Sequence, residues 1–243
     1  VFGTGGILAK FAVNRVEKDA DLMKSLIRDK VWILGLIFQF LLGSVFLILA
    51  QLLIGPALVP GLTSVGLIVL AMGSVKILGE SLKAHEIFGI LILILAIFLL
   101  GLSNLSIELS TDNLKFSFLT RAYLFSGVAF ALVGTCAWIQ RKLERIRGLL
   151  FALASGLLFS IENLWLGSAM LLLLKAFQES LLLGEIFILL IALAFEVIIN
   201  VYGVIFLQKA YSAGQASNLS SIQTVPIQLG PVIIYFLVFL LTP

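Results

Sequence analysis

Long apolar runs separated by short polar stretches make up most of this chain. The runs are too long and too uniformly apolar for barrel strands, and backbone groups inside lipid must be hydrogen-bonded within the protein. A spanning helix needs about 20 largely apolar residues, so the runs predict membrane helices. The eight predicted segments are 1–13 (a partial span), 31–53, 57–79, 86–104, 121–140, 147–175, 184–208 and 216–242.

Composition supports an integral membrane protein in the lipid bilayer. The mean hydropathy is +1.18 and 12% of residues are charged, whereas a soluble domain carries about 25%. The net charge of +3 lies in the connections and does not form a nucleic-acid-binding patch. Cys136 is the only cysteine, which excludes an internal disulfide and a cysteine-rich metal site. Because the chain opens at Val1 without Met, we expect further residues upstream.

Basic residues in the connections predict the orientation. Only three basic residues follow even-numbered segments: Lys115, Lys175 and Arg121, the last counted as a loop residue. Eleven basic residues follow odd-numbered segments. Because cytoplasmic loops carry the excess of Lys and Arg, these connections are predicted to lie on the cytoplasmic side of the plasma membrane, with the visible N-terminus outside. The eleven that follow odd-numbered segments are Arg15, Lys18, Lys24, Arg28, Lys30, Lys83, Arg141, Lys142, Arg145, Arg147 and Lys209.

Two carboxylates stand in the middle of otherwise apolar segments. Glu162 and Glu196 each lie near the centre of a predicted span. An ionisable side chain at this depth costs roughly 2.5–3.5 kcal/mol or more, so it usually faces the bundle interior or a wet cavity. A solute pathway is therefore the leading interpretation, and a protonated Glu held by an interhelical hydrogen bond is the alternative.

Amide and hydroxyl side chains extend this candidate site. Asn200 lies four residues after Glu196 on the same helix face. Carboxylate and amide oxygens suit a magnesium ion that keeps several waters, and the predicted metal ligands are Glu162, Glu196 and Asn200. The same groups suit an organic cation, and a buried carboxyl group can also exchange a proton for a cation. The predicted substrate-binding residues are Glu162, Glu196, Asn200, Gln39, Asn163, Gln223 and Thr224.

The two halves of the chain resemble each other. A shift of 157 residues places Gln51 on Gln208 and Gln39 on Glu196. The predicted fold is an all-α bundle of two inverted four-helix repeats joined by a linking helix, an arrangement typical of transporters. A ninth helix is expected after the visible end. The predicted divisions are 1–105 for the first repeat, 106–146 for the linker and 147–243 for the second repeat.

Other polar and helix-breaking residues have structural interpretations. We expect Lys10 to snorkel to the interface and Lys76 to pair with Glu80, four residues later on the same helix. Pro56 and Pro60 stand at the start of one apolar segment, and Pro226 and Pro231 lie inside another. Such prolines either expose carbonyl ligands or make kinks that neighbouring helices repair.

Two motifs resemble the drug/metabolite transporter superfamily. Residues 77–103, ILGESLKAHEIFGILILILAIFLLGLS, are similar to its LGE…E…G…LI…G signature, and residues 206–227 resemble the turn that precedes a small-residue helix. The W-x-x-G-L opening at Trp32 and the helix number are most similar to NIPA-type magnesium transporters, with EamA-type members also similar. The resemblance implies alternating access, with magnesium as the lead substrate and no bound cofactor.

Other function classes remain as alternatives. One is a proton-coupled exporter of drugs, amines or amino acids, and another is a non-transporting membrane scaffold. An enzyme is not expected, because the chain has no paired aspartates, no HExxH motif and no Ser/His pairing. The expected partners are the bilayer and a small solute or cation, and a homodimer is compatible with a bundle of this size.

Overall fold

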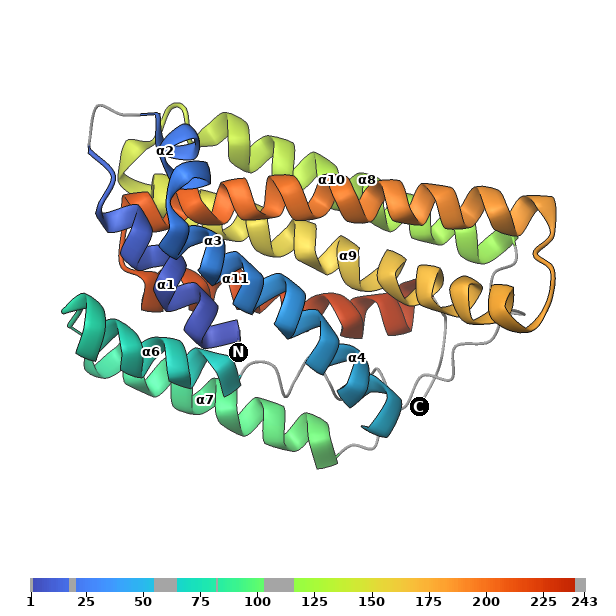
Figure 1. Cartoon of the computed structure of the whole chain (residues 1–243), viewed down its shortest axis with the longest axis horizontal. Coiled ribbons are helices and arrows are strands. Elements are labelled where there is room, and N and C mark those ends of the chain that lie inside the picture. The colour runs from blue at the N-terminus through green and yellow to red at the C-terminus, as the bar shows by residue number, and fades with distance from the viewer. Residues whose placement is uncertain (1, 18–20, 55–64, 82, 103–115, 239–243) are drawn as a thin grey trace.

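The computed structural model describes residues 2–17, 21–54, 65–81, 83–102 and 116–238, and every regular element in these ranges is a helix (Figure 1). In chain order the elements are α1 (Phe2–Asn14), α2 (Leu22–Arg28), α3 (Lys30–Leu36), η1 (Ile37–Leu42), α4 (Gly43–Ile54), α6 (Val65–Leu78), α7 (Ala84–Leu102), α8 (Phe116–Ile139), η3 (Glu144–Ile146), α9 (Arg147–Gln178), α10 (Leu183–Ala213), α11 (Ala216–Ile233) and η4 (Ile234–Val238).

The predicted all-α membrane protein is confirmed. In the part of the chain that the structure describes, four helices are long and apolar enough to cross a membrane: α8, α9 with η3, α10, and α11 with η4. A bent pair, α2 with the helix that follows it, would make a fifth span. The predicted segments that precede α8 are helical as α1, α3–η1–α4, α6 and α7.

Some predictions concern positions that the structure does not describe. Pro56 and Pro60 lie outside the described residues, as does Lys115. The side chain of Gln51, one anchor of the repeat alignment, is also outside them. These positions therefore keep the status of sequence-based expectations.

A short helix, α2, occupies part of the first basic connection, which the hydrophobic pattern left without structure. The Asp21 side chain accepts a hydrogen bond from the backbone N–H of Lys24 at its start. Asp29 then begins α3 by accepting from the N–H groups of Val31 and Trp32, at 2.7 and 3.2 Å. Aspartate is a favoured N-cap residue, so both starts were readable in the sequence. The two helices meet at a bend of 85°.

Two π-helical turns interrupt the long helices. Residues Ile37–Leu42 form η1, in the middle of the first long apolar segment. Residues Ile234–Val238 form η4, which begins three residues after Pro231, a residue that cannot donate a backbone hydrogen bond. Single π-turns inside helices are frequent at functional sites.

Helix α9 is central to the bundle and approaches its neighbours closely at glycines. A Cβ on Gly156 would lie 2.2 Å from the carbonyl oxygen of Gln223 in α11. A Cβ on Gly203 of α10 would lie 2.9 Å from the ring of Phe159 in α9. Small residues let membrane helices approach in this way, so these glycines set the spacing of α9, α10 and α11.

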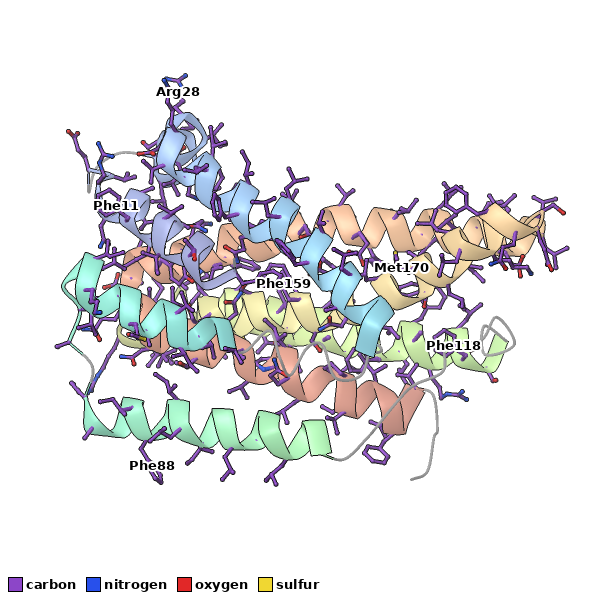
Figure 2. All side chains as sticks on the ribbon, turned by 60° about the horizontal axis from the view of Figure 1, so that its bottom comes forward. Phe11, Arg28, Phe88, Phe118, Phe159 and Met170 are labelled. Atoms are coloured by element: carbon purple, nitrogen blue, oxygen red, sulfur yellow. The ribbon has the colours of Figure 1, made fainter. Side chains whose placement is uncertain are left out.

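Two groups of buried side chains hold the bundle together. One joins α8, α9, α10 and η4 around Trp165, whose indole N–H donates to Ser126 of α8 at 2.9 Å. The other joins α1, α2 and α3 to α9, α10 and α11. Arg121, counted above as a loop residue, lies inside α8 and donates to the carbonyl of Val238 at 2.7 Å. Helix α7 packs beside α6 at the edge of the molecule, and its Phe88 side chain points away from the bundle (Figures 1 and 2).

Candidate functional site

A cavity of about 390 Å³ lies among α1, η1, α4, α6, α9, α10 and α11. It collects polar side chains from segments that are far apart in the sequence. All seven residues that the sequence singled out for substrate binding line it: Gln39, Glu162, Asn163, Glu196, Asn200, Gln223 and Thr224. The structure therefore brings the predicted set together in one place.

Asn200 connects the two acidic helices. Its side-chain amide donates to Oε1 of Glu162 at 3.2 Å, from α10 across to α9. The same amide donates to the backbone carbonyl of Glu196, one turn earlier in α10, at 2.9 Å. The predicted same-face relation of Glu196 and Asn200 is thus present, and Asn200 holds one carboxylate of the pair by a direct hydrogen bond.

Two buried oxygens in this cavity have no hydrogen-bond partner among the described residues. They are Oε1 of Glu196 and Oε1 of Gln39. A buried acceptor without a partner costs about 1–3 kcal/mol, so these oxygens are well suited to a bound cation or donor. Gln39 lies in the π-turn η1, which places it opposite the carboxylates from another helix.

The polar residues of α11 are held by neighbouring helices. The Gln223 amide donates to Ser155 Oγ at 3.0 Å, and Ser155 donates to the carbonyl of Gly203 at 2.9 Å. Thr224 donates within its own helix, to the carbonyl of Ser220 at 2.8 Å. This chain of bonds ties α9, α10 and α11 together directly beside the cavity.

The cavity is acidic. Glu162 and Glu196 are its only charged lining residues among those that the structure describes, and no Lys, Arg or His lines it. A search of the described residues finds no group of three or more His, Cys, Asp and Glu that could hold a metal ion. A divalent ion here would therefore rely on two carboxylates, amide oxygens and its own waters.

Aromatic residues form part of the remaining wall, and the hydrophobic pattern did not single them out. The rings of Phe40 and Phe159 lie 6.3 Å apart, with Phe2 also lining the cavity. Figure 2 shows Phe159 and Met170 along α9, where the blue helix of residues 30–54 crosses it. In an apolar segment, a phenylalanine that faces a cavity cannot be told from one that faces lipid.

Two expectations about charged side chains were wrong. Lys10 does not snorkel: it is 6% exposed and donates to the backbone carbonyls of Tyr211 and Gly214. Glu80 does not pair with Lys76; its carboxylate accepts from the backbone of Ala216 instead. Both groups find partners in the C-terminal half of the chain, which a local reading of i,i+4 spacing could not reveal.

The arrangement suits the binding of a positively charged solute. Two carboxylates, the unpartnered side-chain oxygen of Gln39 and several aromatic rings line one cavity. No protein-family model, curated protein or solved structure matches this chain. The resemblance carried by residues 77–103 and 206–227 consequently remains a proposal.

Proposed function

We propose that the protein is a membrane transporter that carries a cation through this cavity. The observation that carries the proposal is a pair of carboxylates, Glu162 and Glu196, in a cavity whose described lining holds no basic residue. Two acids placed in a low-dielectric bundle are expensive, and a cation or protons would offset that cost.

Alternating access between two inverted repeats is the proposed mechanism. In support, α1 packs against α3 and α6, just as α9 packs against α10 and α11. The shift of 157 residues that aligns Gln39 with Glu196 relates these two sets of helices. This plan also supports membership of the drug/metabolite transporter superfamily, with the basic connections on the cytoplasmic side.

Magnesium is the lead substrate of this proposal. A water molecule occupies about 30 Å³, so a cation with six waters needs about 180 Å³ and fits a cavity of about 390 Å³. Glu162, Glu196, Asn200 and Gln39 would bind the hydrated ion, largely through its waters.

An organic ammonium ion is the second candidate, favoured by a separate observation. The paired rings of Phe40 and Phe159 line the same cavity as the carboxylates. Aromatic faces bind cations and apolar groups, whereas they contribute little to a hydrated metal ion. A proton-coupled exporter of amines would use the same site, with the carboxylates exchanging protons.

Flux measurements on the full-length protein in proteoliposomes test both candidates. We expect protein-dependent uptake of Mg²⁺, and the loss of that uptake in Glu162→Gln and Glu196→Gln. Glu144→Gln and Glu179→Gln, which change exposed acids at helix ends, serve as matched controls and should transport normally.

The same vesicles separate the substrates. Uptake of benzylammonium under a proton gradient, without Mg²⁺ flux, would identify the substrate as an organic cation and not magnesium. Uptake of neither ion by folded wild-type protein would contradict cation transport. Unchanged flux in both Glu162→Leu and Glu196→Leu would show that the carboxylate pair is not the transport site.

A further inference from the structure

The turn between α10 and α11 is held by two charged side chains from the N-terminal half of the chain. Lys10, near the end of α1, donates to the carbonyl of Gly214 at 2.6 Å and to that of Tyr211. Glu80, just after α6, accepts from the backbone N–H of Ala216 at 3.0 Å. We call this pair of side chains, Lys10 and Glu80, the clamp.

Glu80 holds the first turn of α11 with both of its oxygens. Besides Ala216, it accepts from the N–H and the hydroxyl of Ser217, at 3.4 and 3.3 Å. Gly79 makes this reach possible, because its φ of 68° turns the chain out of α6 in a conformation that favours glycine. The Gly-Glu pair of the LGE motif therefore has a structural role between the two halves of the chain.

The charges of the clamp match the ends of the helices that they contact. A carboxylate at the start of α11 and an ammonium group at the end of α10 are both favoured by the helix dipoles. Lys10 is buried, and a buried ammonium group is costly unless it is hydrogen-bonded. Both Lys10 and Glu80 therefore keep their contacts only while the α10–α11 turn stays in this position.

The clamp connects directly to the wall of the cavity. Tyr211 gives its carbonyl to Lys10, while its hydroxyl lies 2.7 Å from Ser220 Oγ. Tyr211 and Ser220 both line the cavity, and Ser220 lies one helical turn after Ser217, which Glu80 contacts. A movement of the α10–α11 turn would thus move two lining residues.

The clamp lies at the end of the bundle that carries the basic run 141–147. We call this end of the bundle the basic face. Gly148, at the start of α9, is packed against this turn: a Cβ there would lie 3.2 Å from that of Ala213. Figure 1 shows α1, α6 and α10 ending at the same end of the molecule, where α9 and α11 begin. From Tyr211 and Ser220 the cavity extends the other way, toward Met170 and Gln228.

A buried glutamine beside the clamp points to a second arrangement of this turn. Gln208, one turn before Tyr211, is fully buried, and neither polar atom of its side chain has a partner among the described residues. Buried polar groups are usually hydrogen-bonded. Displacement of the end of α10 would bring this amide to water or to a new partner.

We propose that the clamp is a gate that closes the cavity toward the basic face, and that its release opens the cavity there. The proposal rests on the proposed function in treating the cavity as the transport path. Lys10 and Glu80 act by holding the turn and do not bind the solute. Breaking either contact should shift the protein toward a state open at the basic face.

Thiol labelling from each side of the membrane tests the gate. Thr224→Cys in a Cys136→Ala background places one thiol in the cavity, and a membrane-impermeant cationic methanethiosulfonate reports its accessibility. We expect Lys10→Gln and Glu80→Gln each to raise the labelling rate from the basic face about tenfold and to lower it from the other face. Lys76→Gln and Glu17→Gln, which change exposed residues, should leave both rates unchanged.

The outcomes separate the gate from loss of folding and from the substrate question. Faster labelling from both faces would mean a loosened bundle and would overturn the gate, as would unchanged labelling from the basic face. Mg²⁺ and benzylammonium flux, measured in separate vesicles on protein that keeps Thr224 and Cys136, test the function by itself. Face-specific labelling changes without any flux would keep the gate and reject cation transport, whereas flux with no labelling change would do the reverse.

Discussion

Asn200 shows how single residues organise the candidate site. Its spacing from Glu196 is local, one helical turn, and follows from the sequence. Its hydrogen bond to Glu162 joins α10 to α9 and depends on how deeply the two helices pack. The sequence therefore predicted which residue types meet, while the pairing of donor and acceptor required the positions of both helices.

Removal of the Asn200 amide should weaken cation binding. We expect Asn200→Leu to lower the apparent affinity for the transported cation about five- to tenfold, because one hydrogen bond that orients Glu162 contributes about 1 kcal/mol. Concentration-dependent uptake in proteoliposomes measures the effect. Asn163→Leu, at a lining residue without a hydrogen bond to either carboxylate in the described structure, should have the smaller effect; equal effects would contradict a specific role for Asn200.

At the scale of helices, the apolar pattern located the elements well but not their irregularities. Where the structure describes them, the eight apolar segments are helical except at the end residues Gly79 and Gln140. Helix α2 was missed because its residues are too polar for a membrane span, although Asp21 and Asp29 carry the N-cap signals. The π-turns, whose hydrogen bonds run from residue i to i+5, have no comparable signature, and no side-chain cap marks the start of η1.

The approach of α9 to α11 gives a prediction at this scale. Gly156→Ala places a Cβ 2.2 Å from a backbone oxygen of α11, which cannot move without moving the helix. We expect destabilisation by about 1–3 kcal/mol, seen as a lower midpoint of thermal unfolding in detergent.

Gly127→Ala in α8 is the matched control, because no atom lies within 4 Å of the added Cβ. There the better helix propensity of alanine should stabilise the protein by up to about 1 kcal/mol. A Gly156→Ala protein as stable as the wild type would show that α9 and α11 are not closely packed.

At the scale of the whole molecule, the helix connections define two ends of the bundle. The α8–α9 connection and the α10–α11 turn share one end, and the α9–α10 turn lies at the other (Figure 1). At that second end, Lys175 and Glu185 form an ion pair of 2.7 Å. The excess of basic residues at the first end predicts that this end is cytoplasmic.

Labelling of whole cells tests this orientation. In a Cys136→Ala background, we expect an impermeant thiol reagent outside the cell to label Phe177→Cys, which is 89% exposed at the end of α9. The same reagent should label Lys142→Cys only after the cells are permeabilised. The reverse pattern would invert the proposed orientation and place the clamp on the outer side.

The sequence by itself determined the all-α membrane class and the identity of the polar residues at membrane depth. Both follow from short-range chemistry: the length and polarity of each run, and the cost of charge in lipid. Only the tertiary structure decided that seven such residues share one cavity with phenylalanine rings. It also decided that Lys10 and Glu80 hold a turn more than 130 residues away, because such contacts depend on helix packing, which local spacing does not encode.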